Sequence, residues 1–425
     1  MSILINIDEL AWETRQKLNK ELEIKMVNKY DIGPPRYIYP FEIEDDNNII
    51  LPFSYASHNL KLSRPKRVRF PNIKVKFEGI LRPEQQEVRQ EALKRLSKTG
   101  SILMSMYTGF GKSATSMKLA CDTGFKTLVI VNKLVLLKQW EEGIKRFCSK
   151  ATVQRITTKS EKKDVDFYII NAQNVEKMGK EFFSDVGTVI IDESHLIMAE
   201  TLSKSMRYVF PRYLIGLTAT PYRVDGLNKL LDLYFGEYKI IRKLYREHTA
   251  YKVTTGFKPT IETTANGRVN WGIVLDSQAN DVERNELIIR LLRHFSERNF
   301  LVLTKRISQG EYLIQRLEEE GEDVTSLLGN NQEFEVTSRI LIGTSSKVGV
   351  GFDHPRLDAL LLAADLEQYF IQYLGRVFRT KEVEPIIIDL VDDYSLLTKH
   401  FATRRKVYKE HGGVVKNFDL EDLVY

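Results

Sequence analysis

Short apolar runs rich in branched residues recur along this chain, and segments with helical periodicity, such as 309–320, separate them. Two series of runs cover 102–106, 127–131, 167–171, 188–192 and 213–218, and then 299–304, 323–328, 339–344, 358–363 and 385–390. Such alternation is typical of β-α-β units, which build parallel sheets covered by helices. The sequence therefore predicts an α/β fold with two tandem parallel-sheet domains.

The parts of the chain outside these two series have a different pattern. Residues 237–276 are polar and contain several glycines without a sustained period, so we expect a linker with some strand. Residues 1–76 start with a helix-like stretch and continue through Gly33-Pro34-Pro35, which indicates a small N-terminal accessory domain. With 425 residues in all, the predicted domains are 1–76, 77–236 and 277–425, with 237–276 as the linker.

Bulk composition limits the classes of partner and of site. Lys and Arg number 63 and Asp and Glu 57, and the resulting net charge of +6 permits nucleic-acid binding without requiring it. Two cysteines, Cys121 and Cys148, are too few for a disulfide framework or a four-thiolate zinc site, and they fit a reducing compartment. Every apolar run falls short of the roughly 18 residues of a membrane span. We therefore expect a cytoplasmic protein without a membrane partner.

A glycine-rich turn lies between the predicted strand 102–106 and a helix-like segment. A strand, a turn and a helix start of this kind surround one anion with backbone N–H groups. In such a loop we expect Lys112 to reach the β- and γ-phosphates of a nucleotide and the Ser113 hydroxyl to be a ligand for Mg²⁺. The full phosphate-loop pattern has glycine where Met106 stands, so an ordinary tight turn is the alternative. The turn comprises Thr108, Gly109, Phe110, Gly111, Lys112 and Ser113.

Two adjacent acids stand where the predicted strand 188–192 ends. Asp192 is placed to hold Mg²⁺, and Glu193 to orient and deprotonate an attacking water. A capping Asp-Glu pair at a helix start is the alternative, and the phosphate loop upstream argues against it. His195 gains a coupling role only from its place in this motif.

Eight short motifs, the acidic pair among them, follow one another in order from Leu81 to the C-terminal region. In type and order they resemble the motifs of superfamily 2 DNA helicases and translocases. Details such as Tyr222 to Leu227, Arg284-Asn285 and the tail from Arg404 to Gly412 look closest to the poxvirus-type transcript-release and phage branch-migration helicases. The motifs span 81–85, 131–140, 171–173, 192–195, 218–221, 303–305, 343–353 and 372–379.

The resemblance implies two RecA-like domains that bind ATP and Mg²⁺ between them. Arg376 and Arg379 are candidate arginine fingers, with two solvated surface arginines as the alternative. Asp353 is implied at the ribose, although a turn Asp before Pro355 is equally compatible with the pattern. The residues implied at the nucleotide, in catalysis or in coupling are Arg82, Gln85, Gly351, Asp353, Gln372, Arg376, Arg379, His195, Thr218 and Thr220, beside those of the phosphate loop.

The resemblance also implies a nucleic-acid track along strand ends of both domains, where small polar groups and lysines contact phosphate without reading sequence. Family likeness favours DNA, single-stranded, forked or branched, and 3′ to 5′ movement, with RNA or a DNA–RNA hybrid left open. Implied partners are transcription or recombination proteins of a virus or phage. A restriction-type motor and an ATP-gated clamp without strand separation are the rival functions. The contact residues implied are Asn132, Lys133, Gln139, Gln173, Thr304, Lys305, Thr344 and Ser345.

Overall fold

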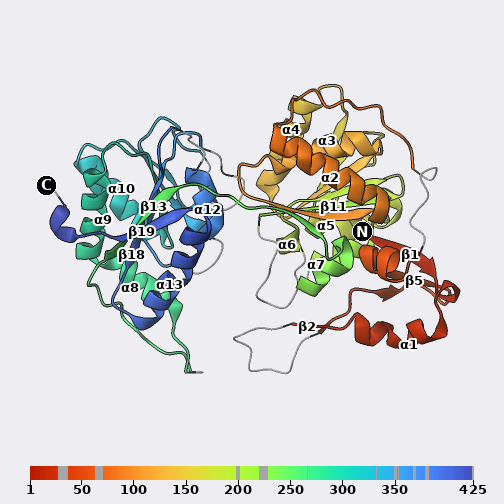
Figure 1. Cartoon of the computed structure of the whole chain (residues 1–425), viewed down its shortest axis with the longest axis horizontal. Coiled ribbons are helices and arrows are strands. Elements are labelled where there is room, and N and C mark those ends of the chain that lie inside the picture. Colours follow the sequence, from red (N-terminus) through yellow and green to blue (C-terminus); the bar gives the residue numbers. More distant parts are fainter. Residues whose placement is uncertain are drawn as a thin grey trace. The chain divides into compact units, whose positions relative to one another are not determined.

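The computed structural model divides the chain into two compact units, Met1–Arg242 and Lys243–Tyr425 (Figure 1). The division falls inside the stretch 237–276 that we expected as a linker. The structure describes residues 1–26, 37–62, 70–197, 202–219, 228–265, 267–331, 333–348, 352, 354–366, 370–378 and 382–423.

Within its described residues, the first unit contains a parallel sheet of seven strands. Strands such as β6 and β7 are buried along their whole length, as expected for a sheet covered on both faces. In spatial order the strands are β12 (Lys239–Arg242), β6 (Ser101–Met106), β11 (Tyr213–Thr218), β10 (Thr188–Ile191), β7 (Thr127–Val131), β9 (Phe167–Asn171) and β8 (Val153–Ile156).

Helices cover both faces of this first sheet. Figure 1 shows α2, α3 and α4 on one side and α5, α6 and α7 on the other, as right-handed crossovers require when the chain runs first one way and then back across the sheet. The helices are α2 (Pro83–Thr99), α3 (Lys112–Thr123), α4 (Leu134–Phe147), α5 (Ala172–Met178), α6 (Ser194–Ile197) and α7 (Asn228–Phe235).

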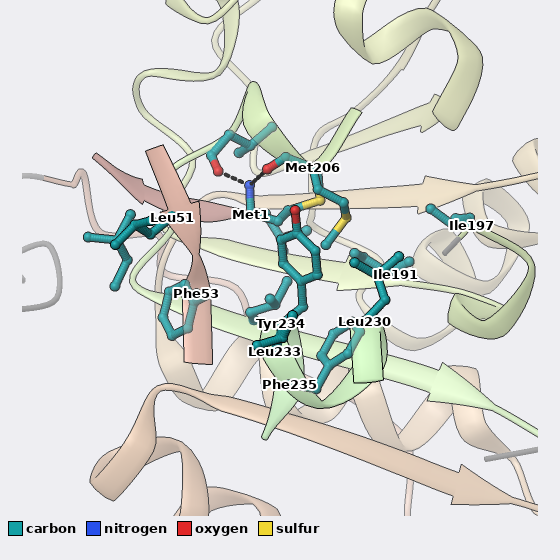
Figure 2. Packing of buried hydrophobic residues seen from close by; sticks show 14 of the residues in the cluster. Met1, Leu51, Phe53, Ile191, Ile197, Met206, Leu230, Leu233, Tyr234 and Phe235 are labelled. Carbon is teal, nitrogen blue, oxygen red and sulfur yellow. Dashed lines mark hydrogen bonds between the residues drawn. The ribbon is translucent and has the colours of Figure 1, made fainter. Parts of the chain in front are cut away.

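The N-terminal segment has an antiparallel sheet of its own but shares a core with the first unit. Figure 2 shows Met1 and Phe53 packed with Tyr234 of α7, and all three side chains are buried. The Met1 amino group donates hydrogen bonds to the carbonyls of Met206, at 2.6 Å, and Val209. This segment is therefore an integral part of the packing of the first unit. Its elements are β1 (Ser2–Asn6), α1 (Trp12–Glu21), β2 (Ile24–Lys25), β3 (Tyr37–Ile38), β4 (Glu42–Ile43) and β5 (Asn48–Pro52).

The described residues of the second unit also form a parallel sheet of seven strands, so the prediction of two tandem parallel-sheet domains is confirmed. In spatial order the strands are β15 (Val324–Leu327), β16 (Ile340–Thr344), β14 (Phe300–Thr304), β17 (Ala359–Leu362), β18 (Ile386–Val391), β13 (His248–Thr254) and β19 (Gly413–Asn417). The helices are α8 (Trp271–Asn280), α9 (Val282–His294), α10 (Ile307–Glu319), α11 (Ser345–Val348), α12 (Phe370–Val377) and α13 (Ser395–Glu410).

The stretch 237–276 contributes strands to both sheets. β12 pairs with β6 at the edge of the first sheet, and β13 lies between β18 and β19 in the second. β12 has four residues and β13 has seven, and both carry polar side chains, so their apolar pattern is weak in the sequence. No helix among the described residues is long and apolar enough to cross a membrane.

Candidate nucleotide site and nucleic-acid face

The phosphate loop connects the end of β6 to the start of α3. Gly109 and Gly111 have φ values of 91° and 89°, in the left-handed region that favours glycine. A Cβ at Gly111 would lie 2.3 Å from Gln85 Nε2, so a side chain at this position would force its neighbour to move. α3 begins at Lys112, whose Nζ donates to the Met106 carbonyl at 3.1 Å. The loop thus has the close turn that a phosphate cradle requires, with the lysine folded across it.

Arg82 and Gln85 lie against this loop. The Gln85 side chain is buried; its Oε1 accepts the Arg82 backbone N–H at 2.8 Å, and its Nε2 donates to the Phe110 carbonyl at 2.8 Å. The Arg82 guanidinium donates to the carbonyls of Phe110 and, at 3.4 Å, of Gly109. Arg82, implied at the nucleotide, and Gln85, which the resemblance implies as the amide that recognises the base, therefore lie beside the loop implied at the phosphates.

The acidic motif lies at the same edge of the sheet as the phosphate loop, because β11 runs parallel between β6 and β10. Both oxygens of Asp192 are held: Oδ1 accepts the Glu193 N–H at 2.9 Å, and Oδ2 accepts the Trp140 indole N–H at 2.8 Å. Burial and, next, the Glu193 carboxylate raise the pKa of Asp192 to about 6, while Trp140 and Lys112 act in the opposite direction. A cation beside Asp192 would offset the free-energy cost of ionising this buried carboxyl group.

Glu193 has a strained backbone. Its φ of 48° is left-handed, which costs a non-glycine residue on the order of 1–3 kcal/mol and is found mostly at functional sites. Its Oε2 is buried 3.4 Å from His195 Nδ1 and accepts no hydrogen bond from any residue the structure describes. A carboxylate oxygen that accepts no hydrogen bond can accept a proton from a water molecule that enters the site.

His195 and Thr218 join the acidic strand to its neighbour. His195 Nδ1 and Thr218 Oγ1 are 2.8 Å apart, and the Ser194 hydroxyl donates to the Leu217 carbonyl at 3.1 Å. The third implied coupling residue, Thr220, lies outside the described residues. The described pair links the ends of β10 and β11.

The residues present fit Mg²⁺ held jointly with phosphate. Among the described residues, no group of three or more His, Cys, Asp or Glu is placed to hold a metal by itself. Mg²⁺ is ordinarily bound by one or two carboxylates together with substrate phosphates and water. Asp192 and the Ser113 hydroxyl, in the first turn of α3, would supply the protein's share of such a set.

The nucleic-acid residues implied in the first unit follow two neighbouring parallel strands, β7 and β9. Asn132 and Lys133 lie between β7 and α4, and Gln139 is exposed on α4. The Gln173 N–H donates to Asn171 Oδ1 at 3.0 Å in the first turn of α5. Burial lowers the pKa of Lys133, and Glu193 opposes this shift, so the lysine lies within electrostatic reach of the acidic motif.

The implied contact residues of the second unit also meet at strand ends. Thr304 is directly opposite Thr344 where β14 pairs with β16. Thr304 Oγ1 is buried and has no hydrogen-bond partner among the described residues, while the Ser345 carbonyl accepts the Tyr373 hydroxyl at 2.7 Å. Burial lowers the pKa of Lys305, which follows Thr304. Both units thus place polar residues of the implied track at the carboxyl edge of their sheets.

Gln372 and Arg376 lie on α12 and are both buried. The Arg376 guanidinium donates to the Phe352 carbonyl, so it is turned toward its own unit. Arg379, Gly351 and Asp353 lie outside the described residues.

Trp140 is a site residue without a role of its own among the sequence predictions. Leu136, Trp140 and Ile144 are four apart on α4, and that spacing indicates a buried helix face. The spacing does not reveal that the indole N–H bonds a carboxylate, because the partner is 52 residues away in the sequence.

Comparisons with known proteins agree with this geometry. Residues 78–223 match the family model described as "Type III restriction enzyme, res subunit". The chain is 43% identical to "Putative helicase 161L" of Invertebrate iridescent virus 6, over 99% of this chain and 100% of that protein. It is 24% identical to "Putative ATP-dependent RNA helicase L396" of Acanthamoeba polyphaga mimivirus, over 99% and 86%. It is 25% identical to "Transcript termination protein A18" of Yaba-like disease virus, over 77% and 74%.

A solved structure of S. cerevisiae Dbp5 L327V bound to RNA and ADP BeF3 superposes with a TM-score of 0.57 at 14% identity. The superposition covers 79% of this chain and 94% of that one. At this identity the likeness shows the fold alone, and it agrees with two tandem RecA-like sheets.

Proposed function

Because this chain belongs to the superfamily 2 helicase family, as its viral helicase relatives show, we propose that it is a Mg²⁺-dependent motor that moves along DNA from 3′ to 5′ as it hydrolyses ATP. We further propose that it acts in recombination, repair or transcription inside an infected cell, with transcription or recombination proteins as partners. The observation that carries the catalytic part is the pair of acids beside the phosphate loop, one fixed by two hydrogen bonds and one with an open oxygen.

Each side chain in this site has a separate task. Lys112 and the N–H groups at the start of α3 hold the β- and γ-phosphates. Asp192 and Ser113 hold Mg²⁺, which neutralises charge on the phosphates when it is bound. Glu193 Oε2 accepts a proton from the attacking water. Arg376 supplies positive charge to the transferred phosphate once it leaves the Phe352 carbonyl.

ATP hydrolysis is coupled to movement along the nucleic acid by contacts between the ends of neighbouring strands. The His195–Thr218 contact ties the acidic motif to β11. Hydrolysis changes the charge held at the acidic motif, and this contact passes the change to the next strand. Alternating grip on phosphates by the two sheet edges then moves the strand.

The nucleic-acid class is the open part of the proposal. Hydroxyl, amide and lysine groups at the sheet edges bind phosphate and do not distinguish DNA from RNA. Motif likeness to transcript-release and branch-migration helicases supports DNA, whereas the name of the mimivirus relative favours RNA as the second candidate. The test is the ATP hydrolysis rate with single-stranded DNA, duplex, forks, RNA and DNA–RNA hybrids at one salt concentration. Stimulation by RNA alone would replace DNA with RNA.

Two rival functions share the nucleotide site. An ATP-gated clamp and a restriction-type motor hydrolyse ATP without separating strands, and the restriction-family match covers residues 78–223, which lie within the first unit. Displacement of a labelled strand from partial duplexes with a 3′ or a 5′ tail separates these functions from a helicase. Displacement on the 3′-tailed substrate is expected, and hydrolysis without displacement on either substrate would favour the rivals.

A further inference from the structure

Helix α4 bonds one acid of the nucleotide site directly and, at its N-cap, lies within electrostatic reach of the other. Trp140, 2% exposed, donates its indole N–H to Asp192 Oδ2 at 2.8 Å. At the first turn of the helix, Lys133 lies within electrostatic reach of Glu193. A single rigid element therefore reaches the implied metal ligand and the implied base.

The same helix presents its first turn to the outside. Lys133 is the N-cap residue and forms no side-chain capping hydrogen bond, so its side chain satisfies none of the first-turn N–H groups. Leu134 and Val135 follow it with 72% and 48% of their surface exposed. Gln139 is also exposed, while Leu136, Trp140 and Ile144 form the buried face. Three of the implied phosphate contacts thus lie at or near the start of α4: Asn132 and Lys133, both partly buried just before the helix, and the exposed Gln139.

The length of α4 makes it suitable for passing a displacement from one site to the other. A helix of this length spans about 20 Å and moves as one body, because its backbone hydrogen bonds resist bending. Trp140 follows Lys133 by two turns, so a shift at the first turn is transmitted to the indole. The indole ring has a single N–H donor, and the strength of its hydrogen bond depends on the angle at which it meets the acceptor. The bond to Asp192 is therefore sensitive to such a shift.

We propose that Trp140 is a positioning residue through which nucleic acid bound at the start of α4 controls the orientation of the Asp192 carboxylate. The inference rests on the proposed function, since it requires a nucleic acid on α4. With the strand bound, α4 holds the indole so that Asp192 is aimed at the metal position. Without it, the carboxylate is less well fixed, and the nucleotide site is less active.

The test compares two changes on the buried face of α4. Trp140→Phe keeps an aromatic ring and removes the N–H donor, whereas Ile144→Val trims the packing of the same face and touches no acid. The first measurement is the Mg²⁺ concentration needed for half-maximal binding of a non-hydrolysable ATP analogue, with and without single-stranded DNA. The second is the factor by which that DNA stimulates ATP hydrolysis. Thermal melting checks that each full-length variant folds.

In the wild type, DNA should lower the required Mg²⁺ concentration and raise the hydrolysis rate. In Trp140→Phe, both effects of DNA should shrink by about 5-fold or more, the lower end of typical coupling between two sites. Ile144→Val should retain both effects of DNA.

An equal loss of coupling in the two variants would show that the loss comes from altered packing, and it would overturn the positioning role. Unchanged coupling in Trp140→Phe would overturn it as well. If Trp140→Phe does not fold, the inference is judged on Trp140→His, whose ring retains an N–H donor and should restore part of the coupling. A wild type that DNA and RNA leave unstimulated would instead contradict the proposed function itself.

Discussion

Gln85 and Phe110 are joined by a hydrogen bond of 2.8 Å that ties the first turn of α2 to the phosphate loop. The other end of the same amide accepts the Arg82 N–H at 2.8 Å. A glutamine amide has two N–H donors and two lone pairs, so one of each remains after these bonds. The amide is therefore held in place and still able to bond the donor and acceptor that adenine presents.

Replacing Gln85 with Ala should reduce the preference for ATP over GTP by roughly 10-fold, because the side-chain amide that hydrogen-bonds the base is lost. The measurement is kcat/KM for both nucleotides. Gln90→Ala, an exposed glutamine on the same helix, is the matched control and should keep the preference. If Gln85→Ala lowers kcat/KM equally for ATP and GTP, Gln85 supports the loop and does not read the base.

The central strands and the phosphate loop were predictable because their signals are local. The predicted runs 127–131, 167–171 and 213–218 coincide with β7, β9 and β11, since fully buried strands are continuous apolar runs. Gly109 and Gly111 are recognisable because only glycine accepts their φ values without strain.

Features that depend on distant partners could not be read from the sequence. β13 is an interior strand, yet its run His248–Thr254 contains polar residues, and only pairing with β18 and β19 identifies it. Arg376 is a candidate arginine finger from the sequence, but the sequence does not reveal that its guanidinium bonds the Phe352 carbonyl of its own unit. Cys121 and Cys148 gave no sign in the sequence that their sulfurs lie 3.6 Å apart.

Lys112→Ala and Glu193→Gln should both abolish ATP turnover by different routes. Loss of the Lys112 ammonium should weaken ATP binding, whereas Glu193→Gln should bind ATP and lose about 10²- to 10⁴-fold in turnover, the usual contribution of a general base. Equilibrium binding of labelled ATP, measured beside single-turnover hydrolysis, separates the two effects. Lys94→Ala, an exposed lysine on α2, should match the wild type in both assays. Near-normal turnover in either site variant would refute the site assignment.

Arg376→Ala should leave ATP binding largely intact and reduce hydrolysis by about 10³- to 10⁵-fold, the range of arginine fingers in other nucleotide hydrolases. Arg376→Lys should rescue little, because an ammonium lacks the planar fork of donors. Arg293→Ala removes an exposed arginine paired with Glu320 in the same unit and should have no effect on hydrolysis. Weakened ATP binding with unchanged turnover of the bound nucleotide would assign Arg376 to binding.

The contribution of Asp192 to the stability of the metal-free protein should fall as the pH rises from about 4 to above 6. The pKa of Asp192 is raised from 3.8 to about 6, mainly by burial, so the folded state favours the protonated carboxyl. Its contribution is fully present below the unfolded pKa and is lost as the pH rises through the folded pKa. Thermal melting of wild type and Asp192→Asn without Mg²⁺ measures this, and the variant should gain on the wild type between pH 5 and 7. A constant difference across that range would contradict the raised pKa.

Binding to nucleic acid should weaken steeply with salt and change little with base sequence, because the implied contacts neutralise phosphates. The basic stretch from Lys66 to Arg69 lies outside the described residues, and its contribution to forked or branched DNA stays a prediction from the sequence. Deleting residues 1–76 is not a clean test, since Met1 and Phe53 belong to the core of the first unit. Lys66→Gln, Arg67→Gln and Arg69→Gln together remove the charge and leave that core in place.

A salt titration of affinity on a fork and on a single strand, with wild type and the triple variant, is therefore the decisive measurement. If the stretch contacts the branch, the variant should lose more affinity on the fork, and the slope of log affinity against log salt should fall by up to about 3 for three lost phosphate contacts. Equal losses on both substrates would reduce the stretch to general electrostatic support, since a charge near the track but away from the branch affects both alike. Unchanged affinity on both would leave it as a solvated linker, and the positive charge for the track would then come from Lys133 and Lys305 at the sheet edges.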